Sequence, residues 1–140
     1  MTISLTEDLY TAHVTATGGR AGRVTTDDGL LDVELAVPKE MGGPGGAVNP
    51  EQLFAAGYAA CFQGALGVVG RQRRIDTSAS TVTAEVTIGK VEGGTYGLKV
   101  TLHADIPGAD PETARELVEA ADAVCPYSNA VRGNVEVTFA

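Results

Sequence analysis

The chain is short of basic residues. Its 140 residues include 10 Lys and Arg against 18 Asp and Glu, which gives a formal charge of −8 at pH 7. Nucleic acids and anionic membrane surfaces attract proteins through clustered positive charge, and the few arginines here form no long basic stripe. We therefore expect no nucleic-acid partner and no anionic-membrane partner.

The chain also lacks the marks of an exported or membrane-spanning protein. Its first ten residues, MTISLTEDLY, include acidic residues where a signal peptide carries positive charge, and no apolar core follows them. No window approaches the roughly 20 apolar residues that a transmembrane helix needs. We expect a soluble, cytoplasmic protein with no membrane partner.

Cysteine is scarce, since Cys61 and Cys125 are the only two. Structural disulfides are rare in a reducing cytoplasm, so these residues are either inert buried thiols or redox-active ones. Composition alone does not choose between the two.

Signals for metal, nucleotide or cofactor binding are missing as well. The GGPGG segment is not followed by the Lys and Ser or Thr of a phosphate-binding loop. His13 and His103 lie in strand-like segments with no Cys, Asp or His at ligand spacing, and we interpret both as structural. The sequence therefore predicts no metal site and no bound cofactor.

What the chain does have is a regular order of periodic segments. Its length and its 44% apolar content fit a single domain of residues 1–140. Polar and apolar residues alternate as in strands, and between the first two of these segments GGRAGRVTTDDG is interpreted as a turn. The predicted strands are 10–17, 30–37, 80–90, 96–106 and 134–139.

Two further segments carry helix signals. Asn49 and Pro50 suit the N-cap and first position of a helix over 50–71, about 30 Å long and apolar almost all round. Such a helix has to be buried in a core or against a partner chain. A second helix begins at Asp110–Pro111 and ends at Cys125–Pro126. The fold class is α+β, with helices packed on antiparallel sheet.

Each cysteine falls in one of these two helices. Taken singly, Cys61 is a small apolar residue of a packed core, and Cys125 is a helix-end residue. Taken together they are a natural dithiol pair, provided that the helices lie side by side. Spacing in the sequence cannot show that their Cα atoms approach to the ~4.4–6.8 Å that a disulfide needs, and both interpretations stay open.

A nucleophilic Cys61 would need a nearby cation, because burial in an apolar helix favours the neutral thiol. Arg20, between the glycines of GGRAG, is one candidate, since its guanidinium stays charged and offers several donors. Glu51, on the first turn of the Cys61 helix, is a candidate to orient that arginine through a bidentate pair. The alternatives are a solvated turn residue for Arg20 and a favourable charge at the helix N-terminus for Glu51.

Four stretches, in order and over essentially the whole chain, resemble the Ohr/OsmC family of organic hydroperoxide resistance proteins. They are TATGGRAGRV, LDVELAVPKEMGGPGG, NPEQLFAAGYAACFQGAL and VCPYSNAVRGNVEV. The CPYS sequence at the second cysteine is more similar to the Ohr branch than to the OsmC branch. Val48 and Val131 stand where the family leads us to expect threonine, and these departures affect only loop hydrogen bonding.

The resemblance implies an OsmC/Ohr-like α+β fold. In that fold antiparallel sheets pack around two long central helices, and two chains intertwine as a homodimer with active sites near the interface. It also implies cysteine-based reduction of organic hydroperoxides, including those of fatty acids, in oxidative-stress defence. The electron donor would be an external dithiol, either dihydrolipoamide or a lipoylated protein partner.

Carried over residue by residue, the resemblance makes Cys61 the peroxidatic cysteine and Cys125 the resolving cysteine. Arg20 and Glu51 become the pair that activates Cys61. Apolar residues on the same helix are candidates for the substrate pocket, although the sequence does not separate pocket lining from core: Phe54, Tyr58, Phe62 and Leu66. Two other classes stay open, a ligand-binding protein with inert thiols and a redox sensor without turnover.

Overall fold

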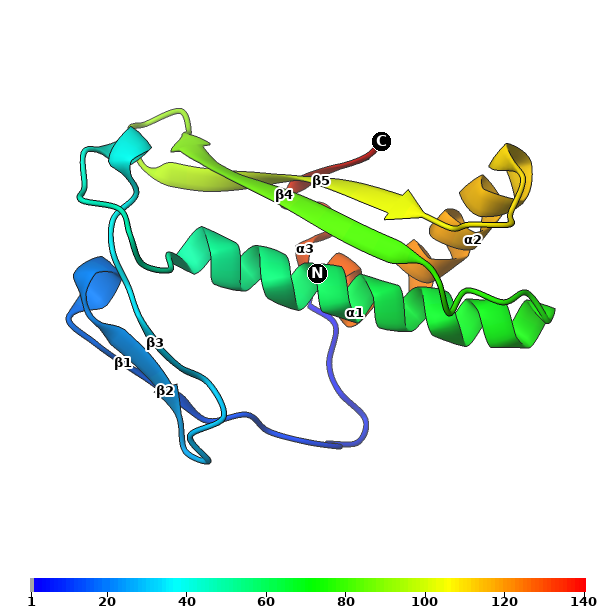
Figure 1. Cartoon of the computed structure of the whole chain (residues 1–140), viewed down its shortest axis with the longest axis horizontal. Helices are drawn as coiled ribbons and strands as arrows, with labels where there is room; N and C mark the ends of the chain where they lie inside the picture. Colours follow the sequence, from blue (N-terminus) through cyan, green and yellow to red (C-terminus); the bar gives the residue numbers. More distant parts are fainter. Residues whose placement is uncertain (1) are drawn as a thin grey trace. The chain divides into compact units, whose positions relative to one another are not determined.

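A computed structural model describes residues 2–140 and divides after Pro50 into two compact units. We call them the N-terminal unit and the C-terminal unit. Figure 1 shows the short strands β1, β2 and β3 in the first unit, and the long helix α1 with strands β4 and β5 in the second. The single domain expected for residues 1–140 stays a prediction.

The N-terminal unit is a three-stranded antiparallel sheet in the order β1-β2-β3. Its elements are β1 (Val14–Thr17), η1 (Gly19–Ala21), β2 (Arg23–Thr26), β3 (Asp32–Glu34) and η2 (Lys39–Met41). Strand β2 lies within a segment that we expected to be a turn, so that prediction was wrong. The turn between β1 and β2 takes only residues 18–22. A Cβ on Gly22 would stand 1.6 Å from the Thr17 carbonyl oxygen, so only glycine fits there.

The C-terminal unit consists of one long helix, two shorter helices and a three-stranded sheet in the order β4-β5-β6. Its elements are α1 (Pro50–Arg73), β4 (Thr81–Lys90), β5 (Tyr96–Asp105), α2 (Pro111–Val124), α3 (Pro126–Val131) and β6 (Glu136–Phe139). β4 and β5 are antiparallel, as expected, but β6 pairs with β5 in parallel. The expectation of purely antiparallel sheet was wrong here, because the α2–α3 connection carries the chain back before it pairs again.

The local helix signals were confirmed. α1 begins at Pro50, and α2 begins at Pro111 with the Asp110 carboxylate accepting the Thr113 N–H at 2.8 Å. The β4–β5 hairpin turns at Gly93 and Gly94, both of which have positive φ. α3 was not expected. It begins directly after α2 because Pro126, which ends one helix, also suits the first position of the next.

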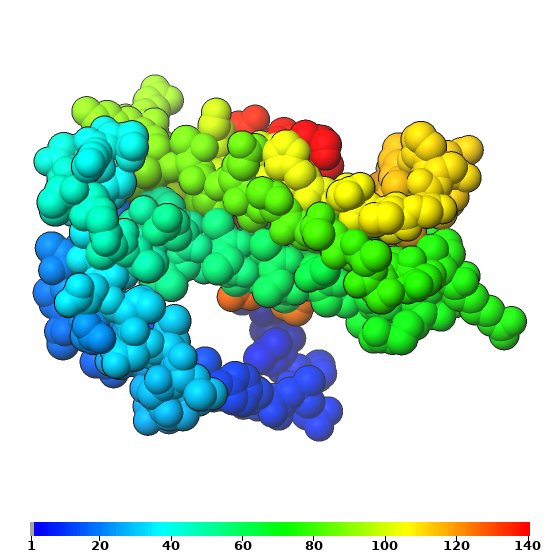
Figure 2. Space-filling view, in the orientation of Figure 1, coloured from blue at the N-terminus to red at the C-terminus, as the bar shows by residue number. Residues whose placement is uncertain are grey.

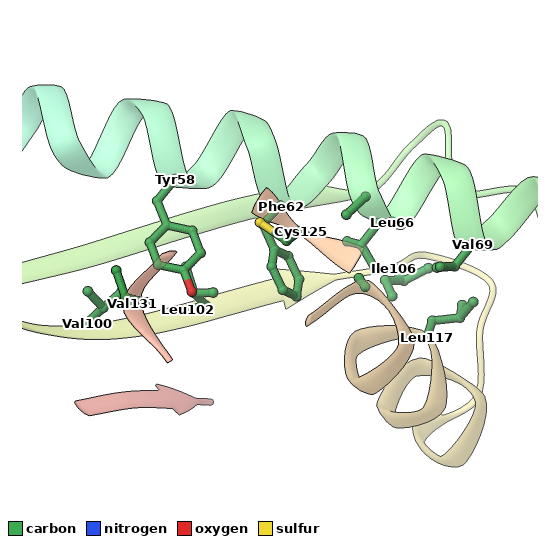
Figure 3. Close-up of a cluster of buried hydrophobic side chains, with 12 residues drawn as sticks. Tyr58, Phe62, Leu66, Val69, Val100, Leu102, Ile106, Leu117, Cys125 and Val131 are labelled. Atoms are coloured by element: carbon green, nitrogen blue, oxygen red, sulfur yellow. The ribbon is translucent and has the colours of Figure 1, made fainter. Parts of the chain in front are cut away.

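The core of the C-terminal unit lies between α1 and the sheet. Figure 3 shows Tyr58, Phe62, Leu66 and Val69 projecting from one side of α1 toward the buried residues Val100, Leu102, Ile106 and Leu117. In the space-filling view of Figure 2, the green and yellow strands lie directly against the helix. The opposite side of α1 is exposed in the single chain and carries small or apolar residues: Ala56, Ala60, Gly64 and Val68. Burial all round the helix, which its composition predicted, is therefore not achieved within one chain.

One expectation about membranes needs correction. α1 is 24 residues long and contains an 18-residue window of mean hydropathy 1.5, which is long and apolar enough to cross a membrane. The expectation that no window approaches this limit was wrong. The core helix of a soluble protein meets the same criteria, so length and composition do not decide the surroundings of this helix.

Candidate active site

The two cysteines meet in the C-terminal unit. Cys61 lies on α1 and is partly buried, Cys125 joins α2 to α3 and is fully buried, and both are free thiols. Backbone hydrogen bonds fix Cys125 on both sides: its N–H donates to Ala121 O at 2.8 Å, and its carbonyl accepts from Asn129 N at 3.0 Å. The extended backbone of Cys125 is the conformation that a following proline imposes.

The surroundings of Cys61 favour its neutral form. Burial is the main cause that raises the pKa of the Cys61 thiol above its ordinary value. The backbone N–H of Tyr127 hydrogen-bonds to the sulfur and lowers this pKa, whereas the charge and hydrogen bond of the Cys125 side chain raise it. The two side chains are therefore close neighbours, which sequence spacing could not establish. A reactive Cys61 needs a cation to offset this burial.

Three aromatic rings form a wall one turn before Cys61. Phe54 and Tyr58 on α1 meet Tyr127 on α3, with ring centroids 5.8 to 6.4 Å apart. Gly57 makes this contact possible, because a Cβ at that position would stand 2.7 Å from the Tyr127 hydroxyl oxygen. Tyr127 was not among the expected site residues, although it follows Cys125 by two positions in CPYS. It contributes both a ring to the wall and an N–H to Cys61.

A buried hydrogen bond links the same helices next to the thiols. The Tyr58 and Ser128 hydroxyl oxygens are 2.7 Å apart, and the two residues are 0% and 2% exposed. Burial raises the pKa of Tyr58, so the phenol is neutral at ordinary pH and keeps its O–H. Sequence reasoning placed Tyr58 in a pocket and overlooked Ser128.

The end of α3 is tied to the end of α2 by Arg132. Its guanidinium donates to Asn129 Oδ1 at 2.6 Å, to the Asp122 carbonyl oxygen at 2.7 Å and to Asp122 Oδ2 at 3.3 Å. The Asp122 carbonyl belongs to the last turn of α2, where backbone acceptors lack helical partners. Arg132 thus caps α2 and holds the corner that contains Cys125.

The four candidate pocket residues have different surroundings. Phe54 is partly buried and Tyr58 is fully buried within the aromatic wall. Phe62 and Leu66 are also fully buried, and Figure 3 shows them inside the core cluster. Phe62 packs on Phe139, with ring centroids 5.7 Å apart. A role in binding substrate stays a prediction for all four.

Arg20 and Glu51 belong to different units. Arg20 lies in η1 of the N-terminal unit, after Gly18 and Gly19, whose φ angles are 72° and 59°. Glu51 lies in the first turn of α1, and Cys61 follows it by about 15 Å along the helix axis. The Glu51 carboxylate can therefore act on Cys61 only through a third group. The assignment of an Arg20–Glu51 pair to Cys61 stays a prediction.

Metal-ligating side chains do not gather in the part of the chain that the structure describes. Among residues 2–140, no group of three or more His, Cys, Asp or Glu side chains is placed to hold a metal ion. His103 lies on the outer face of the sheet, with Nε2 2.6 Å from Glu85 Oε2. This contact is a cross-strand pair on an exposed surface.

Comparison with known proteins connects this geometry to one family. Residues 43–140 match the family model described as OsmC-like protein. An organic hydroperoxide resistance protein of Xanthomonas axonopodis pv. citri is 51% identical over 133 residues, which cover 94% of this chain and 93% of that protein.

Solved structures agree with that match. The crystal structure of an organic hydroperoxide resistance protein from Elizabethkingia anophelis superposes with a TM-score of 0.90 at 53% identity and covers 95% of this chain and 96% of that one. OhrB of Bacillus subtilis gives a TM-score of 0.87 at 47% identity, with 94% and 98% of the two chains covered. These matches confirm the expected OsmC/Ohr-like fold class, and the chain belongs to the OsmC-like family, in its branch of organic hydroperoxide resistance proteins.

Proposed function

We propose that the protein is a thiol peroxidase that reduces organic hydroperoxides to alcohols and so takes part in oxidative-stress defence. The observation that carries this proposal is the proximity of the two thiols: Cys61 on α1 packs against the buried cluster that contains Cys125, and the Cys125 side chain acts on the Cys61 thiol. Two relatives at about 50% identity are named organic hydroperoxide resistance proteins, which supports the same chemistry.

In the first step the Cys61 thiolate attacks the distal oxygen of ROOH. The O–O bond breaks, the alkoxide takes a proton and leaves as the alcohol, and Cys61 becomes a sulfenic acid. Because burial holds the pKa of Cys61 high, thiolate formation needs a positive charge. We assign that charge to the Arg20 guanidinium, which Glu51 orients. The same guanidinium stabilises the negative charge that develops in the transition state.

In the second step the Cys125 sulfur attacks the sulfur of the Cys61 sulfenic acid. The S–O bond breaks, and the hydroxide leaves with the thiol proton of Cys125 as water, so that a disulfide forms. This capture keeps Cys61 from irreversible oxidation to sulfinic acid. An external dithiol, dihydrolipoamide or a lipoylated protein, then reduces the disulfide by two exchanges and becomes a disulfide itself. No bound cofactor takes part in this cycle.

The aromatic wall favours hydroperoxides with an apolar R group, including those of fatty acids. Phe54 and Tyr127 supply apolar surface near Cys61, with the buried Tyr58 ring packed against both. Tyr127 is 39% exposed, so a ligand can reach it from solvent. Burial of a hydrocarbon chain against such rings contributes free energy that hydrogen peroxide cannot gain. Phe62 and Leu66 support the wall from the core behind it.

The functional form is a homodimer. In the single chain, apolar residues of the N-terminal segment are 70–87% exposed: Ile3, Leu5, Leu9 and Tyr10. The exposed side of α1 adds the small or apolar residues Ala56, Ala60 and Val68. Exposed apolar surface of this extent is typical of an interface. Light scattering should give about twice 14.3 kDa, and a monomer at micromolar concentration contradicts the proposal.

We place the protein in the cytoplasm, without nucleic-acid or membrane partners. The formal charge of −8 disfavours polyanions and anionic lipid. The reducing cytoplasm also keeps the dithiol pool that the cycle consumes. Fractionation of the cells that make the protein tests this placement, and recovery with the membrane pellet contradicts it.

The proposed activity is tested by comparing cumene hydroperoxide with hydrogen peroxide in an assay driven by dihydrolipoamide. Cumene hydroperoxide should be the better substrate. Cys61→Ser should abolish turnover, whereas Cys125→Ser should react once and then stall or over-oxidise under excess peroxide. Equal inertness of the two variants in a single turnover refutes the assigned roles.

Thiol titration and peroxide consumption, measured with the same protein and cumene hydroperoxide, distinguish the peroxidase from the two other function classes. A ligand-binding protein with inert thiols keeps both thiols titratable after one equivalent of hydroperoxide. A redox sensor loses its thiols but shows no steady-state consumption of peroxide with dihydrolipoamide as reductant. Loss of both thiols together with steady turnover supports the peroxidase.

A further inference from the structure

The Tyr58–Ser128 hydrogen bond has a particular position relative to the two thiols. Tyr58 precedes Cys61 by one helical turn on α1, and Ser128 follows Cys125 by one turn on α3. The hydroxyl pair therefore joins the same two segments that a Cys61–Cys125 disulfide joins. It does so while both thiols are still reduced, because the oxygens are 2.7 Å apart in the free-thiol structure.

α3 depends on such anchors. It has six residues, and isolated helices of that length are not stable in water. Arg132 ties its C-terminal end to α2, at the Asp122 carbonyl oxygen. The Tyr58–Ser128 bond ties its middle to α1, and it is buried whereas the Arg132 contacts are half-exposed. Loss of the hydroxyl pair would leave α3 attached to α2 but less firmly to α1.

The distance between α3 and α1 matters most after Cys61 is oxidised. The sulfenic acid is consumed in two competing ways, by the Cys125 sulfur or by a second hydroperoxide molecule. Intramolecular capture relies on a high effective concentration, which falls steeply when the reacting groups are misplaced by as little as 1 Å. Neither hydroxyl reacts with peroxide, so Tyr58 and Ser128 would act here by position.

We infer that the Tyr58–Ser128 hydrogen bond is a positioning device that holds Cys125 against Cys61 and sets the partition of the sulfenic acid between disulfide and sulfinic acid. This inference rests on the proposed peroxidase function. It assigns to Ser128 a role in the second step, and to the Tyr58 hydroxyl a role separate from that of its ring.

The main test uses Ser128→Ala with excess cumene hydroperoxide. Intact-mass spectrometry measures the ratio of sulfinic acid to disulfide, and stopped-flow measurement gives the rate of the first oxidation. Disulfide formation should slow about fivefold, which corresponds to about 1 kcal/mol. The first rate should change by less than this, through the neighbouring Tyr127 alone. The ratio of sulfinic acid to disulfide should rise by the factor by which disulfide formation slows.

Tyr58→Phe provides a second, independent variant, because it removes the hydroxyl and keeps the ring. It should raise the ratio of sulfinic acid to disulfide as much as Ser128→Ala does. The double variant should be no worse than either single variant, since all three lack the same bond. Both residues line a cavity of about 170 Å³, so water can satisfy the surviving hydroxyl and we expect both variants to fold, as checked by circular dichroism.

Two controls separate positioning from a general loss of stability. Thr138→Val removes another hydroxyl pair between two elements, the 3.1 Å contact of Thr101 and Thr138 on the outer face of the sheet. Val69→Ala weakens the core two turns beyond Cys61. Neither should change the ratio of sulfinic acid to disulfide.

The possible outcomes are distinct. A wild-type protein that forms no Cys61–Cys125 disulfide with one equivalent of hydroperoxide refutes the proposed function, and this inference with it. If the wild type forms the disulfide but Ser128→Ala and Tyr58→Phe partition as the wild type does, only the inference is overturned. It is also overturned if Val69→Ala shifts the ratio as strongly as they do, because stability alone then explains the effect.

Discussion

Arg132 and Arg115 are both arginines of the α2–α3 region with ion pairs, yet their substitution should have unequal effects. Arg115 pairs with Glu119 one turn along α2 at 3.1 Å, and both side chains are more than 60% exposed. Arg132 reaches across the corner to Asp122, where it satisfies a helix-end carbonyl oxygen, and also bonds to Asn129 on α3. Replacement of each by Met keeps most of the apolar stem and removes the guanidinium, so the two variants are matched.

The geometry allows both costs to be estimated. An exposed pair one turn apart on a helix contributes about 0.3–0.5 kcal/mol, and we expect that loss for Arg115→Met. Arg132 makes two short hydrogen bonds, each with a net contribution near 1 kcal/mol. Its side chain is 49% exposed and that of Asp122 is 31% exposed, so solvent screens the charge and we expect a loss of about 1–2 kcal/mol in total.

Urea unfolding followed by circular dichroism, at one fixed protomer concentration, measures both variants. Added salt should reduce the difference in unfolding free energy between wild type and Arg115→Met. It should leave most of the difference for Arg132→Met, because hydrogen bonds to a carbonyl and an amide depend little on screening. If Arg132→Met costs no more than Arg115→Met, the contacts of Arg132 do not hold the α2–α3 corner. Arg132 then contributes no more to the stability of the corner that contains Cys125 than an exposed ion pair does.

Three further predictions concern the site and its helices. Arg20→Ala should slow the oxidation of Cys61 by cumene hydroperoxide about 100- to 1,000-fold and raise the pKa of Cys61 in a thiolate absorbance titration. Glu51→Gln should do less, because the arginine keeps its charge, and wild-type values for Arg20→Ala would place the activating cation elsewhere. Gly57→Ala should lower the melting temperature, because the new Cβ would stand 2.7 Å from the Tyr127 hydroxyl oxygen. This clash should outweigh the better helix propensity of alanine, about 1 kcal/mol. A higher melting temperature would show that the contact between α1 and Tyr127 does not require glycine at position 57. Hydrogen bonds from Thr113 lower the pKa of Asp110 from its ordinary value of 3.8. The ionised Asp110 therefore stabilises the fold above pH 3.8, and this stabilisation is lost as the pH falls through the lower folded-state pKa. Asp110→Asn should make the melting temperature less dependent on pH in this acid range, and an unchanged profile refutes that role.

Elements with local signals were predictable from sequence, and elements that depend on distant pairing were not. The start of α1 at Pro50 and the start of α2 after Asp110 follow from capping and from the fixed φ of proline. The parallel pairing of β6 depends on where α2 and α3 return the chain, and no residue of β6 encodes that direction. β2 was missed because four residues beside a glycine-rich reversal carry too little alternation to be distinguished from a turn.

The candidate site divides in the same way. The motifs mark Cys61 and Cys125 as residues of interest, but their contact depends on the packing of α1 against the α2–α3 corner. Ser128 and Arg132 follow Cys125 closely in the sequence, and nothing in their spacing reveals that one bonds to Tyr58 and the other to Asp122. Sequence therefore located the two candidate reactive groups, whereas the contacts of Ser128 and Arg132 became visible only in the fold.

The environment of Cys61 has opposite effects on the two steps of the proposed cycle. Burial beside apolar rings raises the pKa of the thiol, which opposes thiolate formation and the first step. The same packing keeps the Cys125 side chain close to Cys61, which favours disulfide formation in the second step. Among the causes that set the Cys61 pKa, the Tyr127 N–H lowers it. Under the proposed mechanism the C-terminal unit supplies capture and protection, and Arg20 of the N-terminal unit supplies activation. A variant that weakens α3 should lose more in capture and protection than in the first oxidation, whereas a variant without Arg20 should lose mainly the first oxidation.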